Sequence, residues 1–181
     1  TFSDTPKENA AKAISELRSL GASHLEILSG DKSAAVRRLA EKVGITEYSA
    51  ELLPQDKLDR FAKIYEENSK KGSVAYVGDG LNDSPVIIRS DVGFAMGKGG
   101  AALSAKAADI VIVNDDIENV PRAVKIAKKT RKIVIGNIVF SLGVKALIMA
   151  VCLIWNPIME LAVLADVGVT LLAVLNCARI K

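Results

Sequence analysis

The sequence contains little cysteine, histidine or aromatic residue, and each shortage removes a class of protein. Its two cysteines, Cys152 and Cys177, form no C-x-x-C pair, which argues against a disulfide-built scaffold and a cysteine zinc site. Phe, Tyr and Trp make up 4% of the 181 residues. No patch interleaves aromatic with basic side chains, so nucleic acid is not an expected partner. No segment resembles a signal or transit peptide, and the single histidine, His24, is given no functional role.

Apolar residues are abundant instead, and they are unevenly distributed. The chain is 50% hydrophobic and 25% charged, with a formal net charge of +3. Residues 1–132 have the composition of a soluble domain, whereas residues 133–181 contain two long apolar runs. We therefore expect two domains with a boundary at 132/133. Because the chain begins at Thr1 rather than at methionine, we expect it to be part of a longer protein.

Helical and strand patterns alternate along residues 1–132. Apolar residues at helical spacing predict helices from Thr5 to Gly21, up to Gly44, from Pro54 to about Lys70, and from Asp116 to about Lys132. Short apolar runs predict strands at residues 24–28, 73–77, 91–96 and 109–113, with a short strand or extended link in EYSAEL. This alternation predicts an α/β fold, a Rossmann-like parallel sheet with helices on both faces.

The apolar runs, about 133–155 and 158–178, predict a transmembrane hairpin. Each is about 20 residues long, enough to cross roughly 30 Å of hydrocarbon as a helix. Only Asn156-Pro157 separates them, and basic residues crowd their far ends, namely Lys125, Lys128, Lys129, Arg131 and Lys132 before, and Arg179 and Lys181 after. The positive-inside rule then places both ends in the cytoplasm. The alternative is a pair of buried helices in a soluble protein.

Two aspartates, Asp79 and Asp83, lie in the glycine-rich stretch VGDGLNDSP, directly after the apolar run SVAYV. Ligand sites of parallel sheets lie at the carboxyl ends of strands, and two carboxylates there repel each other unless a cation neutralises them. Few, hard oxygen ligands favour Mg²⁺, and Gly78 and Gly80 permit close approach of the backbone to a ligand. The alternative is an Asx-type turn of Asp79 and Asn82 without metal.

A second predicted strand end carries Ser29-Gly30-Asp31, and Lys57 lies at the start of the helix after Pro54. The Ser29 hydroxyl suits a phosphoryl oxygen, and an ammonium at Lys57 can neutralise phosphate or pair with a site carboxylate. The alternatives are a helix N-cap at Ser29 or Asp31 and an ordinary solvated lysine. Together, a hydroxyl, a cation and paired carboxylates supply the charge stabilisation that phosphoryl transfer requires.

Lys145 and Asp166 lie about midway along the two apolar runs. A single charge at the centre of a bilayer costs roughly 2.5–3.5 kcal/mol on insertion scales, so opposite charges at similar depth are expected to pair. One interpretation is a structural salt bridge. The other is an ion site in which Asp166 binds a divalent cation and Lys145 replaces the cation when it leaves. The chemistry of the residues does not separate the two.

Three segments, LSGD, LLPQDKL and VAYVGDGLNDSP, resemble motifs of the haloacid dehalogenase superfamily, and more narrowly the phosphorylation domain of P-type ATPases. The resemblance implies that residues 1–132 are the C-terminal part of such a domain, with Mg²⁺ as cofactor and ATP as substrate. The roles it implies are catalytic for Ser29, Lys57 and Asn82, Mg²⁺ binding for Asp79 and Asp83, and phosphate-loop backbone for Gly30, Asp31, Gly78 and Gly80.

The chain also departs from that family. In the family, the nucleophilic aspartate lies in an Asp-Lys-Thr-Gly-Thr loop. In this chain, Asp31-Lys32-Ser33 does not continue with that sequence. The family's nucleotide-binding domain, inserted after that loop, is missing too. We therefore expect the nucleophile, the nucleotide-binding and actuator domains and further membrane segments in an upstream remainder of the polypeptide. We expect no ATP hydrolysis by this chain alone.

FSLGVKALIM and LAVLADVGVTLLAVLN resemble the last two spans of zinc-, cadmium- and lead-exporting P-type ATPases, in which a lysine and an aspartate matching Lys145 and Asp166 are counter-ion and metal ligand. This implies an ATP-driven exporter of Zn²⁺, Cd²⁺ or Pb²⁺ in the plasma membrane. The lipid bilayer is then a partner, and residues 1–132 and the C-terminus are cytoplasmic. Two alternatives stay open: a membrane-anchored phosphatase of haloacid dehalogenase type, and a truncated, non-catalytic regulator that binds Mg²⁺ or phosphate.

Overall fold

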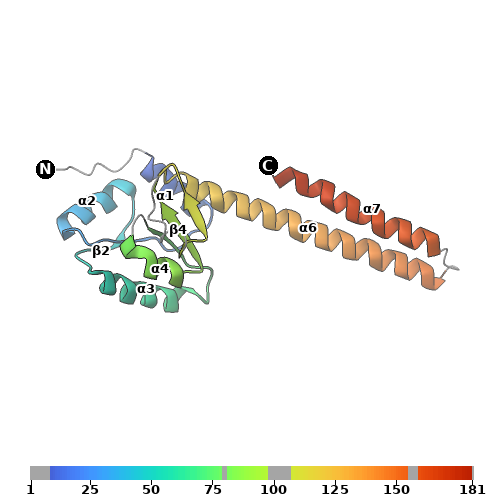
Figure 1. The fold of residues 1–181 in the computed structure, drawn as a ribbon, viewed down its shortest axis with the longest axis horizontal. Helices are drawn as coiled ribbons and strands as arrows, with labels where there is room; N and C mark the ends of the chain where they lie inside the picture. The colour runs from blue at the N-terminus through green and yellow to red at the C-terminus, as the bar shows by residue number, and fades with distance from the viewer. Residues whose placement is uncertain (1–8, 79–80, 98–106, 155–158, 181) are drawn as a thin grey trace. The chain divides into compact units, whose positions relative to one another are not determined.

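The computed structural model describes residues 9–78, 81–97, 107–154 and 159–180. The chain divides into two compact units, Thr1–Arg122 and Ala123–Lys181, which are considered separately below. Figure 1 shows the mixed helices and strands of the first unit and the two long helices of the second.

The first unit alternates helices with short strands, as the spacing of apolar residues predicts. In chain order its elements are α1 (Ala10–Ser19), β1 (Glu26–Leu28), α2 (Ser33–Val43), β2 (Glu47–Ser49), α3 (Pro54–Asn68), β3 (Ala75–Gly78), η1 (Leu81–Asp83), α4 (Ser84–Arg89), β4 (Val92–Met96) and β5 (Ile110–Ile112). The spacing does not predict η1 or α4, because three and six residues are too few to show a helical period. The predicted helix start at Thr5 lies outside the described residues.

The described strands all pair in parallel, which confirms the α/β prediction. They form two sheets, β1-β2 and β3-β4-β5, where the sequence predicts one. Gly78 at the end of β3 is opposite Ala95 of β4, and the N–H of Ser29 donates to Ser49 O at the end of β2. Both loops identified from the sequence therefore begin at the carboxyl ends of parallel strands.

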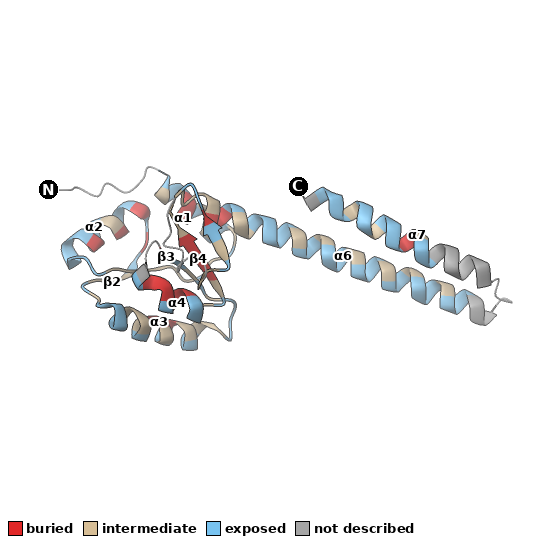
Figure 2. Ribbon diagram, viewed as in Figure 1, coloured by how far each residue is buried: buried red, intermediate tan, exposed pale blue. Residues whose placement is uncertain are grey.

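Two groups of buried apolar residues, red in Figure 2, hold the first unit together. The first group joins α1, α2 and β1 and consists of Ile14, Val43 and Ile45, with Ala10, Leu17, Leu25, Ile27 and Leu39 packed against them. The second joins α4 to β4, and its members Val86, Ile87, Phe94 and Ala95 are at most 2% exposed. Gly93 permits this second contact, because a Cβ there would lie 2.6 Å from Cγ2 of Ile87.

Local residues determine where α3 begins and what it covers. Pro54 is its first residue, where a missing N–H breaks no helical hydrogen bond, and Asp56 Oδ2 accepts a hydrogen bond from Leu53 N at 3.0 Å. Lys57 is thereby placed in the first turn. One turn further, Phe61 packs edge-on against Tyr76 of β3, with ring centroids 5.7 Å apart. Helix α3 thus covers the strand that leads into VGDGLNDSP.

The second unit is built from α6 (Asn119–Ile154), α7 (Met159–Cys177) and the short η2 (Ala178–Ile180). Among the described residues, Asn119–Val151 is one helix long and apolar enough to cross a membrane, and its most apolar window has a mean hydropathy of 2.1. The described apolar stretch of α7, Asp166–Cys177, is shorter. The predicted helix end near Lys132 is wrong, since α6 continues to Ile154. A change from basic to apolar residues does not interrupt backbone hydrogen bonding, and the 132/133 boundary stays a prediction from hydropathy.

Candidate functional site

The ion pair of Lys57 and Asp83 is the centre of the candidate site in the first unit. Lys57 Nζ lies 3.0 Å from Asp83 Oδ1, and the two side chains are 18% and 10% exposed. Lys57 comes from the first turn of α3, whereas Asp83 ends η1 and directly precedes α4. Lys57 is therefore not a solvated surface lysine. The pair holds a carboxylate and an ammonium together just beyond the end of β3.

Gly78 makes room for this carboxylate. A Cβ at Gly78 would lie 2.8 Å from Cβ of Asp83 and 3.1 Å from its Oδ2. Real Cβ atoms do not tolerate the first of these distances, so a side chain at this position would displace Asp83 or the strand. Position 78 requires glycine because Asp83, five residues later, occupies the space that a side chain would need. The sequence predicts Gly78 only as a loop glycine and does not reveal this reason.

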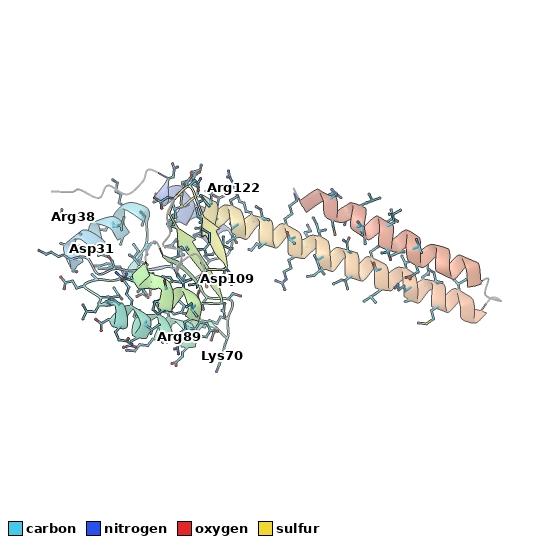
Figure 3. All side chains as sticks on the ribbon, in the orientation of Figure 1. Asp31, Arg38, Lys70, Arg89, Asp109 and Arg122 are labelled. Atoms are coloured by element: carbon cyan, nitrogen blue, oxygen red, sulfur yellow. The ribbon has the colours of Figure 1, made fainter. Side chains whose placement is uncertain are left out.

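Ser29 and Asp31 form a second polar pair, in the loop after β1. Ser29 Oγ donates to Asp31 Oδ2 at 2.9 Å, and Asp31 N donates back to Ser29 Oγ at 3.2 Å. Neither side chain caps α2, whose N-cap residue is Lys32, so the capping alternative is wrong for both. Asp31, labelled in Figure 3, lies beside the start of α2. Gly30 lies close to the backbone, since a Cβ there would be 3.1 Å from Leu52 O.

The predicted residues thus come together as two pairs within the described part of the chain. No hydrogen bond or ion pair between described residues joins Ser29 and Asp31 to Lys57 and Asp83. Asn82 is exposed within η1. Asp79 and Gly80 lie outside the described residues, so the predicted Asp79–Asp83 magnesium site and the alternative Asx turn both stay predictions.

A partly buried ionic cluster at the amino ends of β1 and β2 was missed by the sequence interpretation. Arg60 Nε and Nη2 of α3 donate to Glu26 Oε1 and Oε2 at 2.8 and 2.9 Å, and Ser49 Oγ donates to Oε1 at 2.8 Å. His24 stands 3.5 Å from Glu26 and 3.6 Å from Glu47. The register that pairs Glu26 with Glu47 creates the cluster, and no local sequence signal predicts that register.

The titration of Glu26 reflects two opposing effects. Burial acts to raise the pKa of Glu26, whose side chain is 3% exposed, but the hydrogen bonds from Arg60 and Ser49 and the charge of Arg60 outweigh it. The pKa therefore lies below its ordinary value of 4.5. Because Arg60 contacts both carboxylate oxygens of Glu26, it neutralises that carboxylate and joins α3 to β1.

In the second unit the structure brings Lys145 and Asp166 together. Lys145 Nζ on α6 lies 2.8 Å from Asp166 Oδ1 on α7, and both side chains are more than half exposed at the surface of this helix pair, 56% and 57%. Thr170 Oγ1 donates to the backbone O of Asp166 at 2.9 Å. A pair of opposite charges that joins two apolar helices fits both interpretations. One is a structural salt bridge, and the other is an ion site in which Lys145 is the counter-ion of the metal ligand Asp166.

Near the other end of α7, an asparagine pair joins the same two helices. Asn137 Nδ2 donates to Ala173 O at 3.1 Å and to Cys177 Sγ at 3.3 Å, and Asn176 Nδ2 donates to Asn137 Oδ1 at 2.7 Å. Polar side chains inside apolar helices commonly form such interhelical hydrogen bonds. The pairing depends on which faces of α6 and α7 meet, which the sequence does not reveal.

A model of the haloacid dehalogenase-like hydrolase family matches residues 1–91 of the 181. With half of its length matched and a parallel α/β fold around a strand-end ion pair, the chain belongs to this family. Within this family, the chain is homologous to the heavy-metal-transporting P-type ATPases, as the relatives described next show.

The chain is 43% identical over 179 residues to a zinc-transporting ATPase of Synechocystis sp. and 42% identical over 179 residues to a cadmium, zinc and cobalt-transporting ATPase of Bacillus subtilis. These alignments cover 99% of this chain but 25% and 26% of those proteins. A crystal structure of a zinc-transporting PIB-type ATPase in the E2.Pi state matches with a TM-score of 0.88 at 33% identity, over 98% of this chain and 28% of that one.

These matches confirm the family resemblance and the haloacid dehalogenase-like fold predicted from the motifs. The chain spans about a quarter of the length of the relatives it matches and corresponds to their C-terminal part. The relatives are named for zinc, cadmium and cobalt, and Pb²⁺ stays a prediction.

Proposed function

We propose that this chain is the C-terminal part of an ATP-driven exporter of Zn²⁺ or Cd²⁺ that works through an aspartyl-phosphate intermediate. The observation that carries the proposal is the presence of two ion pairs in one chain. Lys57 and Asp83 lie at a strand end of the first unit, and Lys145 and Asp166 join the two apolar helices. A membrane-anchored phosphatase requires only the first pair, because an anchor gains nothing from the insertion cost of two charges.

In the first unit, Lys57 neutralises charge on the phosphoryl group. The Ser29 hydroxyl exchanges its hydrogen bond to Asp31 for one to a phosphoryl oxygen. The donor set fits Mg²⁺, since Asp83 offers a buried hard carboxylate with Oδ1 toward Lys57 and Oδ2 in the space that Gly78 leaves. Asp83 together with Asp79 would hold the ion, which supplies electrostatic stabilisation of the transferred phosphoryl group. Asn82, exposed beside Asp83, completes this set.

The nucleophile and the nucleotide site belong, in this proposal, to an upstream remainder of the same polypeptide. The strand order supports this placement. Strands β1 and β3 belong to separate sheets, and no described strand pairs with both of them. Helix α3 nevertheless contacts both, through Arg60 to Glu26 of β1 and through Phe61 to Tyr76 of β3. A parallel strand of the remainder that inserts between β1 and β3 would place an aspartate at its carboxyl end beside Ser29 and Lys57.

In the second unit, Asp166 acts as a ligand of the transported cation and Lys145 as its built-in counter-ion. With metal bound, Asp166 contacts the cation; after release, Lys145 neutralises the carboxylate, which is the arrangement at 2.8 Å described above. Both apolar helices cross the plasma membrane, and the first unit and the C-terminus are cytoplasmic. The basic residues that precede and follow the apolar runs support this orientation.

The test uses the full-length protein that contains this chain, reconstituted in vesicles. Asp166→Ala should abolish the stimulation of ATPase activity by zinc, whereas Lys57→Gln should abolish phosphoenzyme formation itself. Ser141→Ala, on the same helix as Lys145, serves as a matched control and should retain zinc stimulation. Unchanged zinc stimulation in Asp166→Ala would exclude the ion site. Hydrolysis of a small phosphate ester without any stimulation by metal cargo would favour the anchored phosphatase.

A further inference from the structure

A basic cavity lies between the two helices of the second unit, away from the Lys145–Asp166 pair. Its volume is about 400 Å³, and it is lined by Lys129, Lys132, Ile133, Gly136, Asn176 and Arg179. Three of the six lining residues are cationic and none is acidic. The cavity is therefore suited to an anion, and its size admits a phosphate with its polar substituent.

The asparagine pair defines one wall of this cavity. Asn176 lines the cavity and donates to Asn137 Oδ1 at 2.7 Å, while Asn137 is bonded to Ala173 O at 3.1 Å. These bonds hold α6 and α7 together beside the cavity. Gly136 leaves its space open, because a Cβ there would meet no atom within 4 Å. The cavity therefore has room for a larger side chain at Gly136.

The cavity lies where the helix surfaces change from basic to apolar. Lys129 and Lys132 end the basic stretch of α6, and large apolar residues follow at once, with Val134, Ile135 and Ile138 between 42% and 53% exposed. On α7, Val174 and Leu175 are 63% and 60% exposed just before Asn176. In a membrane, such a transition lies at the level of lipid headgroups, where cations attract anionic lipids.

We propose that this cavity binds the headgroup phosphate of an anionic phospholipid from the cytoplasmic leaflet. The proposal rests on the membrane insertion in the proposed function. Lys132 and Arg179 compensate the charge of the phosphate, and Ile133 and the exposed apolar residues beside the cavity contact the acyl chains. This apolar surface selects a lipid over free phosphate. A zwitterionic lipid carries its own cation and gains less from these protein cations.

The experiment is native mass spectrometry of the full 181-residue chain released from nanodiscs, with phosphatidylglycerol and phosphatidylcholine as competing probes. We expect at least about tenfold preferential retention of phosphatidylglycerol, since each cation near an anionic lipid is worth roughly fivefold in affinity. Lys132→Gln and Arg179→Gln should each reduce retention of phosphatidylglycerol by about fivefold. Gly136→Leu should remove it without a change in charge.

Arg131→Gln is the matched control, because Arg131 has the same charge and neighbours Lys132 but does not line the cavity. It should retain the lipid. Equal loss in Arg131→Gln and Lys132→Gln would mean diffuse surface attraction and would overturn the cavity site. Full competition by millimolar glycerol phosphate would assign the site to a soluble phosphate and overturn the lipid assignment. A chain that fails to float with vesicles overturns the proposed function as well, whereas an inserted chain without lipid preference overturns only this inference.

Discussion

The carboxylate of Asp83 illustrates how one residue depends on the atoms around it. The residue is 7% exposed, and its Oδ1 contacts Lys57. Its Cβ would lie only 2.8 Å from a Cβ added at Gly78. Removal of one partner from a buried ion pair typically costs about 3–5 kcal/mol, because the remaining charge is left unpaired. The glycine and the lysine are therefore both needed to keep Asp83 in place.

Gly78→Ala tests this dependence. The new Cβ would clash with Asp83, so we expect the Lys57–Asp83 contact to be lost and the free energy of unfolding to fall by about 1–3 kcal/mol in urea titrations. Gly72→Ala is the control, since a Cβ there meets no atom within 4 Å. In the full-length protein, phosphoenzyme formation should fall in Gly78→Ala alone. Equal stability of the two variants would contradict the role assigned to Gly78.

Glu26 predicts a pH dependence of stability. Its pKa in the folded chain lies below 4.5, so its ionised form stabilises the fold at neutral pH, and this contribution is lost as the pH falls through the folded pKa. Glu26→Gln should lower the free energy of unfolding near neutral pH by about 1.5–3 kcal/mol, the value of hydrogen bonds to a charged group. The difference from wild type should disappear below the folded pKa.

Glu41→Gln provides the comparison for Glu26→Gln. Glu41 pairs with Arg37 at 2.9 Å on α2, but the two side chains are 64% and 66% exposed. Exposed pairs of this kind contribute little to stability, so we expect no measurable change at any pH. If the effect of Glu26→Gln persisted at the lowest pH, the contact with Arg60 would not be its source.

At the scale of elements, α3 is the connection between the two sheets. It contacts β1 through Arg60 and Glu26, and β3 through Phe61 and Tyr76. The strands themselves share no hydrogen bonds across that junction among the described residues. Strands β1 and β3 are each at the edge of a sheet, and such edges present backbone N–H and C=O groups that a further strand would pair.

Hydrogen exchange tests the proposed insertion of an upstream strand. Amides of Leu28 on β1 and of Ala75 and Val77 on β3, which alternate with the residues that face β2 and β4, should exchange at least about tenfold more slowly in the full-length protein than in the 181-residue chain, because pairing protects edge amides. Amides of β4, which is paired on both sides already, should change least. Equal slowing in β4 would indicate general stabilisation and would contradict an inserted strand.

At the scale of the whole molecule, the chain contains two charged sites of different chemistry. In the proposed function, the site in the first unit serves phosphoryl transfer and Asp166 of the Lys145–Asp166 pair binds a divalent cation. The proposed function requires that a change at one site alters the other, and α6 runs from Asn119 to Ile154 without interruption. An exporter further requires that both ends of the helix pair lie on the side of the membrane where ATP is available.

Oriented vesicles test that topology. Trypsin added to the cytoplasmic face should cleave within residues 125–132 and after Arg179, where lysine and arginine are concentrated. Trypsin on the opposite face should leave the chain intact, because the sequence between Lys145 and Arg179 contains neither residue. Mass spectrometry of the peptides gives the result. Cleavage from both faces would mean that the helix pair does not span the bilayer in one orientation.

The sequence alone determined the fold class, the family and the candidate residues, because these depend on local information. Apolar periodicity reports which stretches are helix or strand, and the motifs around Ser29, Lys57 and Asp83 are contiguous in the chain. The long apolar runs and their basic flanks predict a transmembrane hairpin for the same reason. None of these inferences required a contact between distant residues.

The tertiary structure decided those contacts between distant side chains that local patterns do not specify. The contact of Lys57 with Asp83, the cluster of Glu26 with Arg60, and the asparagine pair of α6 and α7 each join residues 26 or more positions apart. Strand register and helix rotation set these contacts, and both follow from packing of the whole unit rather than from any one segment. The same packing created the basic cavity beside Asn176, which no motif indicates.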